Sequence, residues 1–502
     1  MRNEAHKVER VLELITTGFL FLFVLVQPIS IAATYIACVG AALAWVMRLI
    51  LVRRRVLHSS PLDALILVYL LFCAASTMIS PLPASSWEGM RKVVLVFLVL
   101  LVAHNVPNAR RAKRLVTLLF ISGLASVAWA GWQYSEGVGL RVHNPEPGTG
   151  FYRAGVQDND VVLRVDGRLI RRPELFLAHL NSKSLTEPLR LRVVHGGGIA
   201  ILKDAVPVEV TPGEWPRANS VDKLGMRIET VRPARAMAFY SHYVSYAFLL
   251  ELLASLAFGL WLVRWHRFSV SGLIFAGLLL VFAIALGTTL TRAAWLALAF
   301  GCAAQVWFHL KRWSIRLLLP LALLLAFVGT NAAMHRWRGM AVIDRSDPGT
   351  EYRILMWRDG LRLIKEHPWF GLGMNTVRDA WWRFDLAAYK KYGLRLHFHS
   401  TPIQIAVDMG LPVLISWVAL MGGYCLMLVR LVARAREQGD SFLYGLALGI
   451  LGGTSGFLAG SLVQYDFGDS VVVLLFWFLA GLALAVRRLL NGKNFSLAGS
   501  TP

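Results

Sequence analysis

The 502-residue sequence is poor in charged side chains, and acidic side chains are the scarcer kind. Asp, Glu, Lys and Arg make up 16% of the residues, below the share of about a quarter that is usual in soluble domains. There are 30 acidic residues against 52 basic ones, for a formal net charge of +22. This composition excludes an ordinary soluble domain and indicates contact with anionic partners.

Cysteine is also rare. The four cysteines lie in separate apolar runs, without the short spacings of metal sites, at Cys38, Cys73, Cys302 and Cys425. We therefore expect neither a disulfide framework nor a cysteine-based metal site. No apolar run contains His-Glu-x-x-His, which excludes the zinc site of an intramembrane metalloprotease. There is no internal repeat of the kind that many transporters have.

The most prominent feature of the sequence is its long apolar runs. Hydrophobic residues make up 56% of the chain, and the mean hydropathy is +0.55. A helix needs about 20 apolar residues to cross a bilayer, so the runs predict an all-α polytopic membrane protein with about twelve transmembrane helices. The predicted cores are 11–27, 30–50, 62–80, 92–105, 115–134, 236–263, 268–289, 293–310, 315–333, 402–429, 441–464 and 470–486. Within one of them, the small residues Gly453-Thr454-Ser455-Gly456 indicate close helix packing.

Basic residues cluster after every second predicted span, for example at Arg53, Arg264 and Arg430. This alternation predicts that both termini are cytoplasmic. The same loops contact anionic lipid head groups, so the net charge requires no nucleic-acid partner. The sequence thus predicts a multi-pass protein of a cell membrane that binds membrane lipids.

The spans divide the chain into five regions. We expect transmembrane helices 1–5, a first outer segment, helices 6–9, a second outer segment, and helices 10–12 with a cytoplasmic tail. Their boundaries are 1–134, 135–235, 236–333, 334–401 and 402–502. Both outer segments have their own turn signals and periodicity, so neither is a simple linker.

The first outer segment combines short strands with one helix. Val161, Leu163 and Val165 alternate as in a half-buried strand, and Asp166-Gly167 predicts a tight turn. A helix at 173–182 and strands at 189–194 and 199–210 follow, then Leu224-Gly225-Met226-Arg227-Ile228. Together with Ala154-Gly155-Val156 and Asn159-Asp160, these features resemble the Ala-Gly-Leu, Gly-Asp and Asn/Asp-Gly pattern of a PDZ domain, with Asn159 in place of the usual glycine. A PDZ domain is a small mixed α/β fold that captures a peptide as an added strand. The resemblance implies a peptide or protein ligand, and a purely structural insert is the alternative.

The second outer segment reads as amphipathic helices. One apolar stripe recurs at helical spacing and ends near Pro368, and a second stripe lies further along the chain. The stripes are Ile354, Trp357, Leu361 and Ile364, then Val377, Trp381, Phe384 and Ala388. Tryptophan beside basic residues suits either an interfacial helix or a lid packed on other helices.

Three patches resemble the O-antigen ligase and polymerase family. Thr288-Thr289-Leu290-Thr291-Arg292-Ala293-Ala294-Trp295-Leu296 is similar to its Ser-Arg-Ala/Gly-aromatic-Leu patch. The stretch from Arg353 to Gly373, with His367-Pro368-Trp369-Phe370-Gly371-Leu372-Gly373, is similar to its Arg…Trp…Pro-x-x-Gly-x-Gly stretch. His399 to Leu414 is similar to its His-Asn-x-x-Leu-Gln-x-x-x-Glu-x-Gly element, with Ser400 in place of asparagine and Asp408 in place of glutamate.

The resemblance implies a glycosyltransferase with a polytopic fold like that of GT-C enzymes. Its donor would be an undecaprenyl-diphosphate-linked glycan, and its acceptor a hydroxyl of the lipid A–core of lipopolysaccharide. It implies no metal and no cofactor. The location would be the bacterial inner membrane, with the active site on the periplasmic face.

The residue types fit that chemistry. His399 stands where an imidazole, whose ordinary pKa is about 6.5, would act as the general base, and His397 is the rival. Arginine forks match phosphate oxygens, so Arg292, Arg353 and Arg358 are predicted to bind the diphosphate. Further candidate substrate contacts are Arg91, Lys92, Arg378 and Arg395, besides His397.

Other functions stay open at this point. A polymerase of lipid-linked glycan repeats or a protein O-oligosaccharyltransferase would use the same chemistry on another acceptor. A lipid-linked glycan transporter is disfavoured because the candidate polar groups gather on one side of the membrane.

Overall fold

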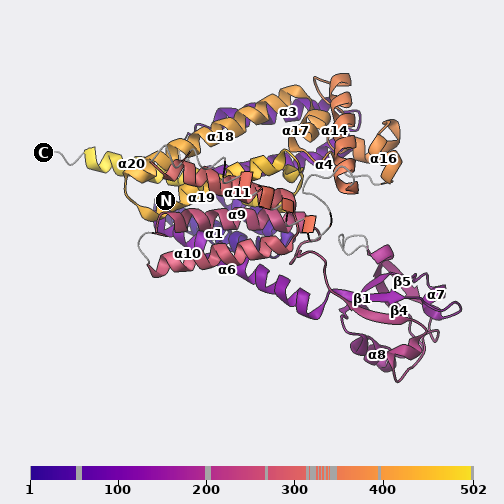
Figure 1. Cartoon of the computed structure of the whole chain (residues 1–502). Helices are drawn as coiled ribbons and strands as arrows, with labels where there is room; N and C mark the ends of the chain where they lie inside the picture. The colour runs from indigo at the N-terminus through magenta and orange to yellow at the C-terminus, as the bar shows by residue number, and fades with distance from the viewer. Residues whose placement is uncertain are drawn as a thin grey trace. The chain divides into compact units, whose positions relative to one another are not determined.

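The computed structural model describes most of the chain, and its description is sparse only in one stretch between 312 and 346. The described residues are 2–52, 59–197, 205–265, 269–311, 347–393 and 397–498, with isolated positions between 316 and 339. The chain forms two compact units (Figure 1). The helical unit comprises Met1–Gly123, Ala247–Leu286 and Thr291–Pro502, and the sheet-containing unit comprises Leu124–Tyr246 and Gly287–Leu290.

Long apolar helices build the helical unit. They are α1 (Arg2–Val26), α2 (Ile31–Val52), α3 (Asp63–Ile79), α5 (Leu98–Asn105), the first part of α6 (Ala109–Glu136), α9 (Tyr243–Leu262), α10 (Val270–Thr288), α11 (Arg292–His309), α18 (Leu411–Glu437), α19 (Ser441–Ser461) and α20 (Ser470–Ala498). Among the described residues, seven helices are long and apolar enough to cross a membrane, namely α2, α6, α9, α10, α18, α19 and α20. This agrees with a polytopic membrane protein, and the full count of twelve stays a prediction.

Two predicted spans are broken in the structure. The span at 92–105 is divided among α4 (Pro83–Val93), the 3₁₀ helix η1 (Val94–Phe97) and α5. The span at 402–429 is divided at Gly410, whose φ of 87° interrupts the helix between the short α17 (Thr401–Met409) and the membrane-crossing α18. Hydropathy predicts each of these stretches as one span because it contains no information on a change in backbone direction. The predicted span at 315–333 falls largely outside the described residues.

Exposed apolar side chains cover the outward faces of several helices. On α10 alone, Leu273, Leu280 and Ile284 are exposed. Patches of this kind are unusual on soluble proteins but are expected where lipid tails surround a helix. All four cysteines are free, as the sequence predicts.

Close contacts of helix backbones hold the centre of the helical unit. A Cβ atom added to Gly449 of α19 would lie 2.8 Å from the Cα of Leu256 in α9. One added to Gly301 of α11 would lie 2.5 Å from the carbonyl oxygen of Gly452. Gly456, from the predicted packing motif, has no room for a Cβ either. Small residues thus let α19 pack against α9 and α11, as expected for helices in lipid.

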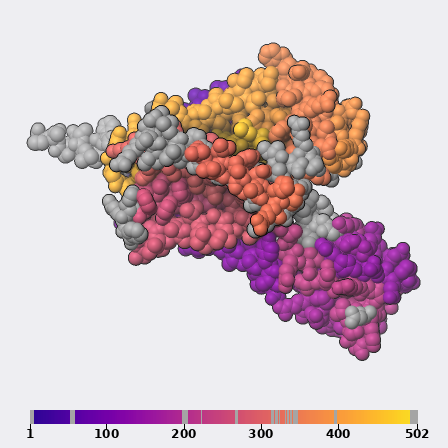
Figure 2. All heavy atoms as spheres, viewed as in Figure 1, coloured from indigo at the N-terminus to yellow at the C-terminus, as the bar shows by residue number. Residues whose placement is uncertain are grey.

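Short helices at one end of the helical unit carry the second outer segment. They are α14 (Pro348–Glu366), α15 (Thr376–Asp379), the 3₁₀ helix η6 (Trp381–Arg383), α16 (Ala387–Tyr392) and α17. Figure 1 shows α14, α16 and α17 near α4, with the C-terminal end of α20 at the opposite end of this unit. In Figure 2, the orange segments that include α14 and α16 form a continuous outer surface at this end of the unit.

The first predicted stripe of this segment is confirmed as the helix α14, but the second is not one helix. The chain turns at Ala380 and again before α16, where the Asp359 carboxylate accepts a hydrogen bond from the Ala387 backbone N–H. These turns bury Val377 and Ala388 in a core shared with α14. Val377 and Ala388 therefore pack against α14, as the lid interpretation expects, and do not belong to one continuous apolar stripe.

The sheet-containing unit is built on one antiparallel sheet, in the order β5-β4-β2-β1-β6, with β3 paired to β2. The strands are β1 (Gly139–His143), β2 (Val161–Val165), β3 (Arg168–Leu169), β4 (Leu189–Val194), β5 (Val206–Val210) and β6 (Arg227–Val231). The helical elements are α7 (Gly150–Arg153), α8 (Pro173–Ser182), η2 (His195–Gly197) and η4 (Val221–Leu224).

Several local predictions for this unit are confirmed. Strands lie at 161–165 and 189–194, and a helix lies at 173–182. Asp166 and Gly167 both have positive φ, at 46° and 78°, which is the backbone of a tight hairpin turn. The last strand begins at Arg227 and not at Leu224, because η4 occupies the preceding residues. The assignment of the unit to the PDZ fold stays a prediction.

We expect Gly449→Val to destabilise the helical unit, because the new side chain would meet backbone atoms of α9 that cannot move aside. Overpacking of this kind typically costs about 1–3 kcal/mol. The matched control is Gly277→Val on α10, where an added Cβ meets nothing within 4 Å. Thermal unfolding of both variants in detergent checks the prediction, which fails if the two unfold at the same temperature.

Candidate functional site

The first feature of the site is an ion pair that joins two helix starts. Arg292 is the first residue of α11, and Asp347 caps α14 just before Pro348. The Arg292 Nη2 donates to Asp347 Oδ2 at 2.7 Å, and Thr350 Oγ1 donates to the same oxygen at 3.0 Å. Burial tends to raise the pKa of Asp347, but these hydrogen bonds prevail and hold it below its ordinary value. Asp347 is therefore ionised and orients the predicted phosphate-binding arginine.

The second feature is the inward face of α14. Tyr352 and Met356 are buried on this face, and Arg353 is half-buried beside them. Trp357, one turn after Arg353, donates its Nε1 hydrogen to the His399 carbonyl oxygen at 3.3 Å. The helix thus brings Arg353 to the same region as the predicted base.

Arg358 lies elsewhere on this helix. It is exposed and lines a shallow groove with Ile354, Leu361 and Arg362 on the outer face of α14. Helical periodicity explains the difference, because Arg353 and Arg358 are five residues apart and therefore lie on different faces. The structure accordingly separates two of the three arginines that the sequence grouped together.

The third feature is a pair of histidines. His397 and His399 have ring centroids 4.3 Å apart and meet edge to face. His399 also meets Tyr352 of α14 at 5.7 Å, and His397 meets Tyr465 at 5.5 Å. His399 has a φ of 49°, a left-handed conformation that is uncommon for a residue with a side chain. Such strain is often found at functional sites.

A cavity of about 230 Å³ borders this pair. Its wall contains His397, Lys92 from α4, Arg378 from α15, and Asp408 with Gln404 from α17. The remaining lining residues are Asn375, Val377, Tyr389, Phe398, Tyr465 and Gly468. Three predicted substrate contacts, Lys92, Arg378 and His397, therefore share one cavity, although their sequence positions are far apart.

Asp408 is the unexpected member of the cavity wall. Its Oδ2 accepts a hydrogen bond from Gln404 Nε2 at 2.9 Å, whereas its buried Oδ1 has no hydrogen-bond partner among the described residues. Burial raises the pKa of this carboxyl to about 7, although Gln404, Lys92 and Arg378 act to lower it. Asp408 can thus change charge near neutral pH inside a site that holds fixed cations.

A glycine loop fixes α17 beside the cavity. Gly371 and Gly373 have positive φ, at 65° and 90°. A Cβ on Gly371 would meet the Asp408 backbone at 2.6 Å, and one on Gly373 would meet Ser80 Oγ at 1.9 Å. The Gly373 N–H donates to the Asp408 carbonyl oxygen at 2.7 Å. The Gly-x-Gly pattern therefore serves a close backbone approach.

The remaining predicted residues are less closely connected with the cavity. Arg91 is exposed, and Arg395 lies outside the described residues. His399 contacts His397 of the cavity wall, and Arg353 lies one helical turn before Trp357, which donates to the His399 carbonyl oxygen. Neither His399 nor Arg353 lines the cavity itself. Arg292 is held by Asp347 at the start of α14.

Sequence reasoning missed Asp347 and Gln404. Asp347-Pro348 carries the signal of a helix start, an Asp cap followed by proline, and could have indicated that a charged group is held there. Gln404 and Asp408 are four residues apart, a spacing that places both on one helix face. Lys92 was predicted as a substrate contact, but its position beside Gln404 and Asp408 could not be predicted, because only the tertiary fold brings α4 to α17.

Comparison with known proteins adds a family similarity over part of the chain. No curated protein matches the chain. The family model that matches covers residues 277–418, which include Arg292, α14, the histidine pair and α17, but neither Lys92 nor the strands of the sheet-containing unit. This model describes O-antigen ligase, and the resemblance that the three sequence patches indicate is confirmed over this segment.

Proposed function

We propose that this protein is a membrane glycosyltransferase that moves a glycan from undecaprenyl diphosphate to a hydroxyl of the lipid A–core, as an O-antigen ligase does. The observation that carries the proposal is the histidine pair, with ring centroids 4.3 Å apart, beside a cavity that contains Lys92 and Arg378. A proton acceptor next to fixed cations suits transfer from a phosphate-activated donor.

His399 is the proposed general base. It takes the proton of the acceptor hydroxyl while the hydroxyl oxygen bonds to the anomeric carbon of the donor sugar. The bond from that carbon to the diphosphate oxygen breaks, and undecaprenyl diphosphate leaves with the electron pair. Tyr352 and Trp357 hold His399 through its ring and its carbonyl oxygen, and His397 is the alternative base.

Cations offset the charge that develops on the departing diphosphate. Arg353 is half-buried on the α14 face that contacts His399, and Arg292 is oriented by Asp347. Guanidinium groups suit this task because their planar fork matches two phosphate oxygens. Lys92 adds positive charge in the cavity, where the low dielectric strengthens its effect. Arg378 contributes its guanidinium group while paired with the neighbouring Asp379 at 2.7 Å.

The membrane location follows the same proposal. We place the protein in the bacterial inner membrane with both termini cytoplasmic and the histidine pair on the periplasmic face. Lipid-linked donor and lipid A–core acceptor would then meet at one bilayer surface.

The acceptor distinguishes this function from its nearest alternatives. A polymerase would join one lipid-linked glycan to another, and a protein O-oligosaccharyltransferase would use a protein hydroxyl. The purified protein in lipid, given lipid-diphosphate glycan and each acceptor separately, tests the proposal on a gel. Glycan transfer to rough lipopolysaccharide alone supports a ligase, whereas transfer only to lipid-linked glycan or to protein contradicts it.

We expect His399→Ala to lower the transfer rate by about 10²–10⁴-fold, the usual contribution of a general base. His397→Ala should have a smaller effect, and exposed His367→Ala at the end of α14 should have none. Initial rates are measured on variants that elute as folded protein. If His397→Ala lost more activity than His399→Ala, the general base would be His397 and not His399.

The Arg292–Asp347 pair predicts a non-additive double mutant. Arg292→Ala should raise the donor KM. Asp347→Asn should raise the donor KM by a smaller factor, roughly 10-fold, because it removes one charge-assisted hydrogen bond. The double variant should be no worse than Arg292→Ala, because Asp347 acts through Arg292. The exposed pair Arg362–Glu366 on α14 provides a control, and Glu366→Gln should leave KM unchanged. Additive losses would mean that Asp347 acts independently.

Asp408 predicts a pH dependence of donor binding. Below its pKa of about 7 the carboxyl is neutral, and above it an anion faces the cavity with Lys92, Arg378, Asp469 and Glu88 nearby. The anion repels a diphosphate, so the donor KM should rise as the pH increases from 6 to 8. Asp408→Asn should flatten this rise, whereas exposed Asp385→Asn should not. An unchanged pH profile of KM in Asp408→Asn would refute the role.

A further inference from the structure

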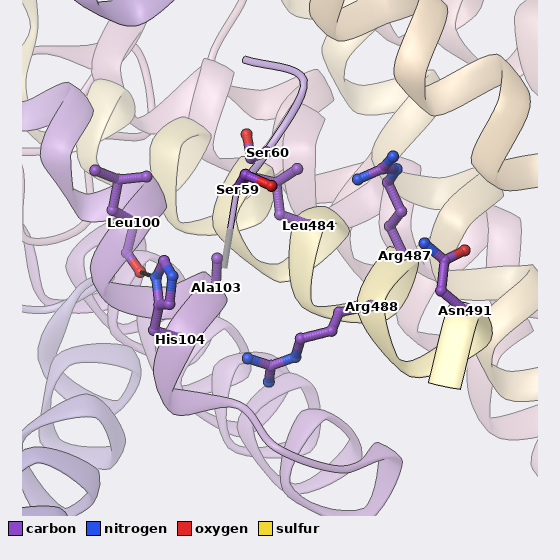
Figure 3. A pocket seen from close by; sticks show the side chains of 9 residues that line it. All are labelled: Ser59, Ser60, Leu100, Ala103, His104, Leu484, Arg487, Arg488 and Asn491. Atoms are coloured by element: carbon purple, nitrogen blue, oxygen red, sulfur yellow. Dashed lines mark hydrogen bonds between the residues drawn. The ribbon is translucent and has the colours of Figure 1, made fainter. Parts of the chain in front are cut away.

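A second polar cavity lies at the other end of the helical unit, away from the histidine pair. It has a volume of about 410 Å³ and is shown in Figure 3. Its wall comes from α5, from α20 and from the residues before α3, and it consists of Ser59, Ser60, Leu100, Ala103, His104, Leu484, Arg487, Arg488 and Asn491. Among the described residues of this wall, none carries a carboxylate.

The length of α20 separates this cavity from the catalytic region. The 3₁₀ helix η7 (Asp466–Gly468), just before α20, contributes Gly468 to the histidine-side cavity, whereas Arg487 and Arg488 lie near the other end of the helix. From Ser470 to Arg487 the helix rises about 26 Å at 1.5 Å per residue. That rise is close to the roughly 30 Å thickness of a bilayer's hydrocarbon core. The two cavities therefore lie at opposite membrane surfaces.

Neighbours hold Arg488 and His104 in place in this wall. Arg488 Nη2 donates to the Val106 carbonyl oxygen at 2.9 Å. His104 shares a hydrogen bond of 2.7 Å between its Nδ1 and the Leu100 carbonyl oxygen, drawn as a dashed line in Figure 3, and its ring stacks on Trp45. Arg487 extends from the adjacent position of α20 and forms no ion pair with a described carboxylate.

Polar donors complete the wall. The Ser60 Oγ accepts a hydrogen bond from the Leu62 N–H at 3.0 Å, which directs its own hydrogen elsewhere. Arg434 of α18 donates to Asn491 Oδ1 at 2.7 Å, which fixes the amide so that its NH₂ group remains a donor. Two guanidinium groups, hydroxyls and an amide around one space without a carboxylate form a donor set for an anion.

We propose that this cavity binds a phosphate group at the membrane surface opposite the transfer site. The phosphate oxygens would accept hydrogen bonds from Arg487, Ser60 and Asn491. Leu100, Ala103 and Leu484 line the cavity with apolar surface, which suits the glycerol and upper acyl region of an anionic phospholipid. Free phosphate offers the same oxygens without the apolar part. This site is independent of the proposed glycan transfer, because none of its residues belongs to the catalytic region.

The test is native mass spectrometry of the full-length protein in detergent, with three separate additions: phosphatidylglycerol, phosphatidylcholine and inorganic phosphate. We expect phosphatidylglycerol to bind, and Arg487→Ala to weaken this binding about fivefold, the factor expected for one cation near a membrane surface. Ser60→Ala provides a second, milder change in the same wall. The matched control is Arg430→Ala, an exposed arginine one turn before Arg434 on α18.

The additions distinguish the sources of the phosphate group. Loss of phosphatidylglycerol binding in Arg487→Ala and Ser60→Ala, but not in Arg430→Ala, assigns the site to an anionic lipid. If only inorganic phosphate binds, and Arg487→Ala and Ser60→Ala but not Arg430→Ala lose that binding, the site is assigned to the free anion. Equal binding of phosphatidylglycerol and phosphatidylcholine that neither cavity variant changes overturns the proposal. If Arg487→Ala unfolds at a lower temperature than Arg430→Ala, the comparison of Ser60→Ala with Arg430→Ala decides the test.

Discussion

The burial of one phenylalanine between two histidines sets the geometry of the candidate site. Phe398 is 1% exposed and packs in the core that α14 shares with α16 and α17. Its backbone N–H donates to Gln404 Oε1 at 2.9 Å, and a Cβ added at Gly360 would lie 2.6 Å from Ile403 Cγ2 and 3.0 Å from the Phe398 ring. Because this anchor is fixed, the flanking His397 and His399 stay close together, and the α14 residues that touch His399 keep their positions.

The charged side chains of the helical unit differ in how their charge is compensated by their surroundings. Arg292 and Asp347 satisfy each other at a helix start, where both are partly buried. Asp408 is fully desolvated on one oxygen, so its charge depends on pH. At the other end, Arg487 and Arg488 surround a cavity with no carboxylate in its wall. The same excess of cations thus has different consequences at the two ends of the helical unit.

Sequence patterns predicted local structure well where a single element decides it. The helix over α14, the strand at 161–165 and the Asp166-Gly167 turn follow from periodicity and turn chemistry, and all are present. The helix expected from Val377 to Ala388 is wrong, because burying both residues in one core requires the chain to turn between them. The spans at 92–105 and 402–429 were drawn too long for the same reason: hydropathy measures transfer into lipid and not backbone direction.

The sequence by itself determined that this chain crosses a membrane and that its histidines and arginines suit phosphate-activated transfer, since composition and residue chemistry are local properties. Only the tertiary structure decided which of these groups meet. Arg353 and Arg358 look alike in sequence, yet Arg353 is half-buried and Arg358 is exposed. Lys92 reaches Asp408 across more than three hundred residues of chain because α4 and α17 belong to one folded unit. These residues are brought together by long-range packing, which no local sequence pattern predicts.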